Sequence, residues 1–232
     1  MRKQLLIFTV IAVIDTVSCR QKPAAPAEQQ PQFTVQLTAD EKAGGLMTPE
    51  IMWKFSRLGT FALSPDGSEI VYDITSIDLA TEARVTNLYK IPVSGGEPLQ
   101  LTATGGSSPQ WIDGGRKIAF TNKGNLMVMN ADGSDIRKID GLSDFEAYSI
   151  SPAGDKIYFT RRVKLDQTAN EKHNLPKAKV RIIDDLMYRH WNYWSDYSYS
   201  HLFLASFDGK KVSDEKDIME GQRFESPLAP YF

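Results

Sequence analysis

One short motif occurs three times in this chain, and its recurrence constrains the fold more than any other feature. Each copy has an apolar run, a tight turn and a second apolar run that ends in an aromatic residue. The copies are Ala62–Tyr72, Trp111–Phe120 and Ile150–Phe159. The first turn, Ser64-Pro65-Asp66-Gly67, has the composition of a type I turn, in which proline presets the second position. The three copies therefore predict three β-hairpins built on one plan.

A second hairpin is expected after each copy. The predicted strands and turns are 87–92 and 98–101 around Ser94-Gly95-Gly96, 125–130 and 136–139 around Ala131-Asp132-Gly133, and 201–207 before Asp208-Gly209. Four short strands in about forty residues are typical of a β-propeller blade. We therefore predict an all-β fold, a partial β-propeller of about three to four four-stranded blades. A sandwich of consecutive hairpins is the alternative, which the regular turn spacing disfavours. The aromatic residues that end the copies are expected in the core: Tyr72, Phe120 and Phe159.

The incomplete propeller is predicted to occupy residues 46–232. A short N-terminal helix is expected, because Thr48 is a suitable N-cap and Pro49 fits the first helical position. An insertion, 161–200, interrupts the third blade, and its second half is rich in aromatic residues. Insertions into repeats usually lie on one face of the fold, often the binding face.

The first 19 residues, 1–19, have the pattern of a lipoprotein-type signal peptide. A basic start precedes an apolar run at 5–14 that is too short to span a bilayer comfortably. Thr16-Val17-Ser18-Cys19 then resembles a bacterial lipobox, and Cys19, the only cysteine, is the candidate lipid-attachment residue. Ordinary secretory cleavage and a structural cysteine are the alternatives, since Thr16 stands where leucine is commonest.

Residues 20–45 are predicted to form a flexible tether. Pro23, Pro26 and Pro31 lie among Ala, Gln and Lys residues, with few large apolar side chains. Such a segment buries too little apolar surface to fold by itself. With the signal peptide, it predicts a lipoprotein that is periplasmic or anchored to the outer membrane of a Gram-negative bacterium.

Composition and charge exclude some functions. Hydrophobic residues make up 41% and charged residues 24% of the chain, as in soluble globular proteins. The net charge is −2 without a basic stripe, so nucleic acid is not expected as a partner. No cofactor is predicted. No metal site is predicted either, because His173, His190 and His201 lack the spacing of metal ligands.

The residues do not predict a catalytic centre within the chain. His190 and His201 flank a serine-bearing loop, which suggests a serine triad. Nothing in the sequence supplies a rigid nucleophile turn or an oxyanion hole beside them. A Gly-x-Ser-x-Gly elbow is absent from the sequence. We therefore assign no catalytic residue.

The repeated turn resembles the propeller repeats of TolB-like proteins and of prolyl-oligopeptidase-family (S9) serine peptidases. The insertion carries the more specific resemblance. Asp184-Asp185-Leu186-Met187-Tyr188-Arg189-His190-Trp191 and Ser200-His201-Leu202-Phe203 resemble a segment of the bacterial dipeptidyl- and acylaminoacyl-peptidase branch. Glu225-Ser226-Pro227-Leu228 is similar to a stretch that follows in those proteins. The resemblance covers 46–232, nearly all of the expected mature chain.

In that family the propeller restricts access to a C-terminal α/β-hydrolase domain, whose Ser, Asp and His cleave short peptides from their N-termini. The resemblance implies that this chain is the propeller segment of a secreted dipeptidyl-peptidase-like serine peptidase. Its implied partners are short peptides, bound by the intact enzyme, the hydrolase domain, and the membrane through the lipid anchor. The chain alone is predicted to be inactive, because the hydrolase domain is absent from it. A stand-alone TolB-like periplasmic binding propeller is the alternative.

Five residues of the insertion are candidates for contact with the substrate or the hydrolase domain: Asp184, Asp185, Arg189, His190 and Trp191. In some dipeptidyl peptidases acidic side chains hold the α-ammonium group of the peptide, a role that the resemblance suggests for Asp184 and Asp185. Capping a turn or facing water is the alternative for the two aspartates. Packing of the insertion onto a blade is the alternative for the other three residues.

Overall fold

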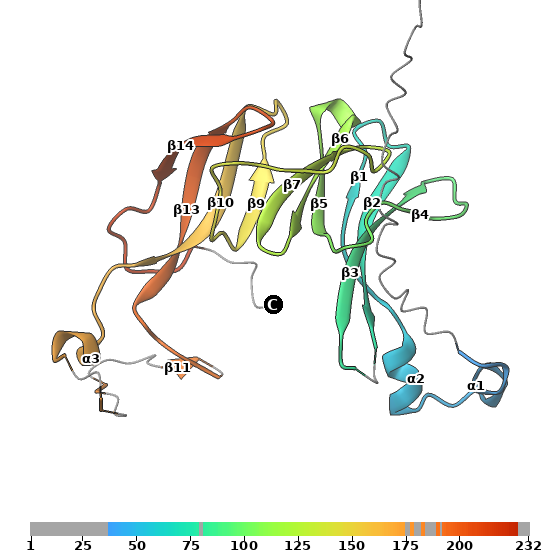
Figure 1. Cartoon of the computed structure of the whole chain (residues 1–232), viewed down its shortest axis with the longest axis horizontal. Coiled ribbons are helices and arrows are strands. Elements are labelled where there is room, and N and C mark those ends of the chain that lie inside the picture. Colours follow the sequence, from blue (N-terminus) through green and yellow to red (C-terminus); the bar gives the residue numbers. More distant parts are fainter. Residues whose placement is uncertain are drawn as a thin grey trace, which may run out of the picture. The chain divides into compact units, whose positions relative to one another are not determined.

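The chain is nearly all β in a computed structural model, which describes residues 37–78, 81–174, 177–178, 182–183, 189–190 and 192–226, without the side chains of His190 and Tyr193. Three four-stranded antiparallel sheets follow one another along the sequence (Figure 1). Each sheet is a meander of consecutive strands, the plan of a propeller blade. We call the sheets blades 1, 2 and 3. The predicted all-β fold and partial propeller are confirmed, with three blades in the described residues.

The bounds of the elements are as follows. Blade 1 contains β1 (Arg57–Leu63), β2 (Glu69–Ile77), β3 (Arg84–Pro92) and β4 (Leu99–Gln100). Blade 2 contains β5 (Ser107–Ile112), β6 (Lys117–Asn122), β7 (Asn125–Asn130) and β8 (Arg137–Lys138), with a 3-10 turn, η1 (Asp113–Gly115), between β5 and β6. Blade 3 contains β9 (Ala147–Ile150), β10 (Lys156–Lys164), β13 (Ser198–Phe207) and β14 (Val212–Asp217). The remaining elements are α1 (Ala39–Gly44), α2 (Pro49–Lys54), α3 (Ala169–Lys172) and a small hairpin, β11 (Arg189–His190) with β12 (Tyr193–Trp194).

The turn between the first two strands is held by its own serine. In blade 1 the Ser64 hydroxyl donates to Asp66 at 2.6 Å and accepts from the Glu69 amide at 2.9 Å. The hydrogen bonds from Ser64 and Ser68 lower the pKa of Asp66 to about 2. Ser151 repeats this arrangement in blade 3, where its hydroxyl donates to Asp155 at 2.9 Å. The recurring serine thus closes the same turn in two blades.

Each contact between blades has its own apolar core. One buried cluster joins blades 1 and 2: Val71, Leu88, Leu101, Trp111, Ile118, Phe120 and Met129. A larger cluster joins blades 2 and 3 and includes Ala119, Val128, Ile150, Ile157 and Phe159. Polar groups add to both contacts. The Trp111 indole donates to the Ala62 carbonyl at 3.0 Å, and the Gln110 amide exchanges two hydrogen bonds with the backbone of Ile150. Blade 2 is therefore covered on both of its faces.

The expectation that all three motif aromatics lie in the core is wrong for Tyr72. Phe120 and Phe159 are fully buried, but Tyr72 is only half-buried. Side chains alternate along a strand, so Val71 and Asp73 of β2 face blade 2 while Tyr72 points to the opposite side. There it stacks on Tyr89, with ring centroids 6.0 Å apart.

Two middle hairpins are longer than the third. In blade 2, β6 and β7 are joined by a two-residue turn, since Asn122 pairs with Asn125. In blade 1 the pairing continues to Ile77 and Arg84, so both ends of the polar stretch 75–84 belong to strands. In blade 3 the pairing continues to Lys164 and Ser198, and these strand ends lie inside the range predicted for the insertion, 161–200.

The N-terminal region contains two short helices. As predicted, α2 begins after Thr48, whose hydroxyl accepts from the Ile51 amide at 3.3 Å. The second helix, α1, was not predicted and lies within the range assigned to the tether. Thr38 and Glu41 cap it reciprocally, a Thr-x-x-Glu signal that is readable in the sequence. Among the described residues, no helix is long and apolar enough to cross a membrane.

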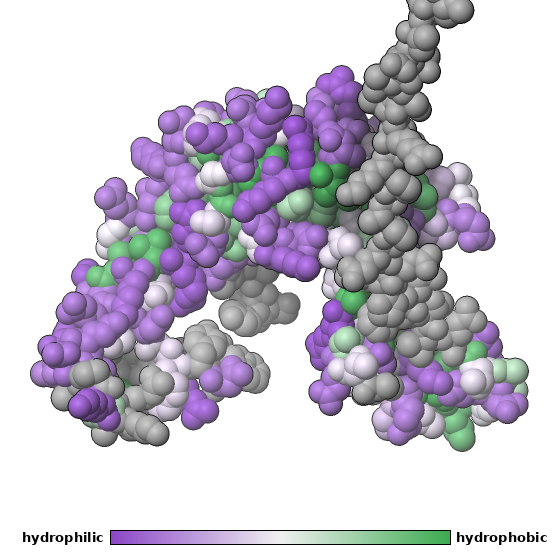
Figure 2. All heavy atoms as spheres, in the orientation of Figure 1, coloured by the Kyte–Doolittle hydropathy of each residue, from purple (hydrophilic) through white to green (hydrophobic). Residues whose placement is uncertain are grey.

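Hydrophilic side chains cover most of the visible surface (Figure 2). Hydrophobic side chains appear between them in patches, one of them beside α1 and α2, where Leu46 and Met47 are exposed. The buried residues of the two clusters lie between the sheets, so the blades are held together mainly by apolar packing.

Candidate functional site

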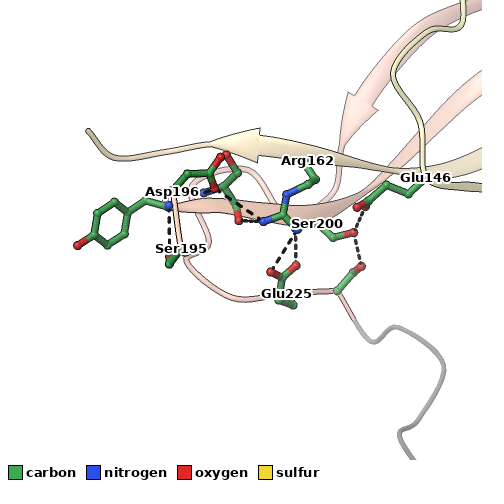
Figure 3. A network of polar contacts seen from close by, with 9 residues as sticks. Glu146, Arg162, Ser195, Asp196, Ser200 and Glu225 are labelled. Atoms are coloured by element: carbon green, nitrogen blue, oxygen red, sulfur yellow. Dashed lines mark hydrogen bonds and ion pairs between the residues drawn. The ribbon is translucent and has the colours of Figure 1, made fainter. Parts of the chain in front are cut away.

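The end of blade 3 that carries the long β10–β13 hairpin contains a network of polar side chains. In a four-stranded meander the connection between strands two and three lies at the opposite end from the other two turns. In blade 3 the other turns are short, and the chain between Lys164 and Ser198 leaves from this end. Side chains from four separate segments meet at the root of this hairpin (Figure 3).

Ser200 of β13 is the centre of the network. Its hydroxyl donates to Glu146 at 2.6 Å, and its backbone amide donates to the Glu225 carboxylate at 2.6 Å. The Ser226 amide donates to the Ser200 carbonyl at 2.7 Å, and the two serine hydroxyls are 3.2 Å apart. Ser200 and Ser226 are buried, so these hydrogen bonds fix the segment around Glu225 against blade 3.

Arg162 of β10 supplies the positive charge of the network. Its guanidinium donates to the Ser198 carbonyl and lies 3.7 Å from Glu225 and 3.9 Å from Asp196. These ion pairs are well exposed to water, so each contributes little to stability. Glu146, bound to the Ser200 hydroxyl, adds a third carboxylate, so the network contains three carboxylates and one guanidinium. The root of the hairpin is therefore acidic overall and presents hydrogen-bond acceptors.

Two further ion pairs hold the chain that leaves the root. Lys164 lies 2.5 Å from Glu171, and this hydrogen bond, with one from the Thr168 amide, lowers the pKa of Glu171 to about 2. Arg223 donates twice to Asp166, at 2.7 and 3.1 Å, and lowers the pKa of that carboxyl. Both ion pairs therefore hold the chain that follows β10, one to Lys164 of that strand and one to Arg223 of the C-terminal segment.

His201 lies beside Ser200 but does not form a catalytic pair with it. The His201 ring is fully buried, with Nδ1 2.7 Å from Asp217 and Nε2 2.9 Å from the Gln222 carbonyl. In a serine triad one ring nitrogen must face the nucleophile. Here both nitrogens face other acceptors, and the Ser200 hydroxyl is directed to Glu146. The pair His201–Asp217 is structural, linking β13 to β14 and the turn that follows.

The predicted site residues of the insertion are only partly described. The Arg189 guanidinium lies 5.3 Å from the centre of the Trp194 ring, a cation–π contact within the small β11–β12 hairpin. The backbone of His190 pairs with Tyr193 in the same hairpin. Asp184, Asp185 and Trp191, as well as Cys19, lie outside the described residues. The contact roles suggested for these positions stay predictions.

Sequence reasoning missed Glu146 and Arg162 as members of the network. Glu146 is 54 residues from Ser200, and no local spacing marks either residue. The motifs Ser200-His201-Leu202-Phe203 and Glu225-Ser226 were singled out separately, and the structure shows that hydrogen bonds join them. Within the described part of the chain, no group of three or more His, Cys, Asp or Glu residues could hold a metal ion.

The architecture defines the chain as part of a β-propeller. The chain is 30% identical over 202 residues to dipeptidyl-peptidase 5 of Porphyromonas endodontalis and 34% identical to that of Porphyromonas gingivalis. Both matches cover 84% of this chain but only 29% of the relative. In structure it resembles the acylaminoacyl peptidase of Pyrococcus horikoshii, with a TM-score of 0.55 and 13% identity over 72% of this chain and 26% of that one. No known protein-family profile matches it.

These similarities confirm the resemblance that the repeats and the insertion predicted. The chain is a partial propeller, related in sequence to dipeptidyl-peptidases over most of its own length. It spans less than a third of the length of the curated relatives.

Proposed function

We propose that this chain is the propeller segment of a secreted dipeptidyl-peptidase-like serine peptidase and restricts the access of substrates to a hydrolase domain. The match to dipeptidyl-peptidase 5 over 84% of the chain carries this proposal. It is supported by three successive blades of the predicted type and by the long insertion in the third. The bond-breaking step belongs to a serine outside this chain, through an acyl-enzyme intermediate.

The long-hairpin end of blade 3 is the proposed substrate-facing or domain-facing end. Its acidic balance suits a peptide that brings a positive α-ammonium group, because complementary charges attract and orient a binding partner. Asp184, Asp185, Arg189, His190 and Trp191 belong to the chain that leaves this root, and they are proposed to contact the peptide or the hydrolase domain. The network around Ser200 would then act by positioning that insertion.

A chimera tests this function. Residues 46–226 of this chain replace the aligned region of the Porphyromonas gingivalis relative, and hydrolysis of dipeptidyl chromogenic substrates is compared with that of a long unfolded polypeptide. We expect turnover of the dipeptidyl substrate only, and no turnover by the 232-residue chain alone. Free cleavage of the polypeptide by a folded chimera, or hydrolysis by the chain alone, would contradict the proposal. A folded chimera with no activity on either substrate would favour a stand-alone binding propeller.

We also propose that Cys19 carries a lipid that tethers the protein to a bacterial membrane, on the strength of the lipobox-like sequence before it. In an expressing bacterium, radioactive palmitate should label the wild-type chain and the Ser18→Ala control, which keeps a small residue before the cysteine. Cys19→Ala should abolish the label and release the protein from the membrane fraction. Equal labelling of Cys19→Ala and wild type would exclude this anchor.

A further inference from the structure

The segment that follows blade 3, residues 222–226, lies against both strands of the long hairpin. We call the chain between the two strand ends, 165–197, the connection. The Gln222 carbonyl lies 2.9 Å from Nε2 of His201, a fully buried residue of β13. The segment is therefore anchored to blade 3 at its first residue.

The last two residues of the segment are anchored as well. The Glu225 carboxylate accepts from the Ser200 amide at 2.6 Å and lies 3.7 Å from the Arg162 guanidinium (Figure 3). The Ser226 amide donates to the Ser200 carbonyl at 2.7 Å, and both serines are buried. Arg162 of β10 and Ser200 of β13 are paired in the sheet. The end of the segment is thus fixed to the strand pair from which the connection leaves.

Between these two anchors, Arg223 reaches the connection itself. Its Nε and Nη2 donate to the two carboxylate oxygens of Asp166, at 2.7 and 3.1 Å. A forked pair of this kind fixes direction as well as distance. Asp166 lies two residues beyond Lys164, the end of β10. Arg223 therefore ties the connection to a segment that blade 3 already holds.

The backbone beside Asp166 is also held. The Leu165 amide donates to the Tyr197 carbonyl at 3.2 Å, which extends the pairing of β10 and β13 by one step. Tyr197 has a φ of 59°, in the left-handed region that residues other than glycine rarely adopt. Such strain persists where the surrounding contacts impose the conformation. The direction in which the connection leaves the blade is therefore set at this root, where Arg223 binds.

We propose that residues 222–226 form a clamp, in which Arg223 is a positioning residue that holds the connection in the orientation that binds the substrate. The inference rests on the proposed function, in which residues of the connection contact the peptide. Arg223 acts through Asp166 rather than by touching the substrate. Without the fork the connection takes other orientations, and the apparent affinity for the peptide falls with the fraction in the binding orientation. The rate of the chemical step is unchanged, because contacts equal in the ground and transition states affect KM alone.

Amide hydrogen exchange of the full chain tests the clamp independently of peptidase activity. In the peptide 165–174, Arg223→Ala should speed exchange about two- to fivefold, as expected for the loss of an exposed ion pair. Asp166→Ala and the double variant should have the same effect, because all three remove one interaction. Arg116→Ala is the matched control, since Arg116 is an exposed arginine paired with Asp113 in the turn between β5 and β6. It should leave exchange of 165–174 unchanged.

The positioning role is tested in the chimera that carries residues 46–226 in the Porphyromonas gingivalis relative. Arg223→Ala should raise KM for the dipeptidyl substrate about two- to fivefold at unchanged kcat. Arg223→Lys, which keeps the charge without the fork, should have an intermediate KM. Arg116→Ala should match the unsubstituted chimera.

Four results would count against the proposal. Unchanged exchange of 165–174 in Arg223→Ala would overturn the clamp. Faster exchange with an unchanged KM in an active chimera would overturn the positioning role and leave the proposed function intact. A fall in kcat at constant KM would show that Arg223 supports the chemical step rather than substrate binding. A folded but inactive unsubstituted chimera would overturn the proposed function and the positioning role together, while the exchange rates still decide whether the clamp exists.

Discussion

Blade 2 and its two neighbours share one hairpin motif, yet equivalent positions in the three hairpins are buried to different degrees. Ile118, Ala119 and Phe120 of blade 2 are all completely buried. In blade 3 the middle one of these positions, Tyr158, is exposed, and in blade 1 the outer two, Ile70 and Tyr72, are half-exposed. The motif thus determines the strand and its turn, while the adjacent sheet determines which side chains become core. Burial in a repeat protein is a property of the neighbour as much as of the repeat.

The largest effect is expected from removing the motif aromatic of blade 2. Phe120→Ala should lower the free energy of unfolding by about 3–5 kcal/mol, because it opens a cavity in a fully packed cluster. Tyr72→Ala, at the equivalent position of blade 1, should cost about 1 kcal/mol, as is usual for a partly exposed site. Urea unfolding in dilute solution, followed by tryptophan fluorescence, measures both. Equal losses would show that blade 1 is covered on both faces like blade 2.

Exchanging the residues at equivalent positions 119 and 158 should separate a buried site in blade 2 from an exposed site in blade 3. Ala119→Tyr places the blade 3 residue at the equivalent position of blade 2, where overpacking should cost about 1–3 kcal/mol. Tyr158→Ala should change the stability of the single chain by only about 0.5 kcal/mol, as at most surface sites. Thermal unfolding of both variants at low protein concentration tests this. A well-tolerated tyrosine at 119 would contradict the close packing between blades 2 and 3.

The next largest effect is expected at a buried carboxylate, Asp73, which stabilises the contact between blades 1 and 2. Asp73 is buried, and its Oδ2 accepts from the Thr60 amide at 3.2 Å and from the Ser108 amide of blade 2 at 3.0 Å. Asp73→Ala leaves both amides without this acceptor and should cost about 1–3 kcal/mol of unfolding free energy. Glu97→Ala, in an exposed turn, is the control and should be neutral. Comparable urea midpoints for the two variants would contradict this role.

The smallest effect is expected in the turn of blade 1 that contains Asp66. This turn is held by its own side chains, so the effect should not depend on the packing of one blade against another. Asp66 has a pKa of about 2 in the folded chain, below its ordinary 3.8. Its ionised form therefore favours folding above about pH 4, and this contribution is lost as the pH falls toward 2. The difference in melting temperature between wild type and Asp66→Asn should shrink between pH 6 and pH 2.5. A constant difference would mean that the hydrogen bonds from Ser64 and Ser68 do not depend on the charge.

Much of the fold was predictable because its signals are local. The serine turns, the strand alternation and the Thr48-Pro49 helix start depend on residues a few positions apart. The candidate site was not predictable to the same extent. Glu146, Arg162 and Glu225 lie far apart in the sequence. They meet at Ser200 because β10 pairs with β13, Glu146 bonds to β10 at Thr160, and Ser226 bonds to Ser200. The half-exposure of Tyr72 was missed because the three copies are identical in pattern and differ only in what packs beside them.

The sequence by itself determined that the chain forms repeated four-stranded units and that its insertion resembles that of dipeptidyl-peptidases. These properties are encoded by turn residues, by period-two alternation and by a contiguous motif. The tertiary structure decided which apolar faces are buried, that His201 is enclosed by Asp217 and Gln222, and that Ser200 is joined to Glu146 and Glu225. Each of these depends on contacts between segments distant in the chain, whose partners are fixed only when the strands pair and the blades pack.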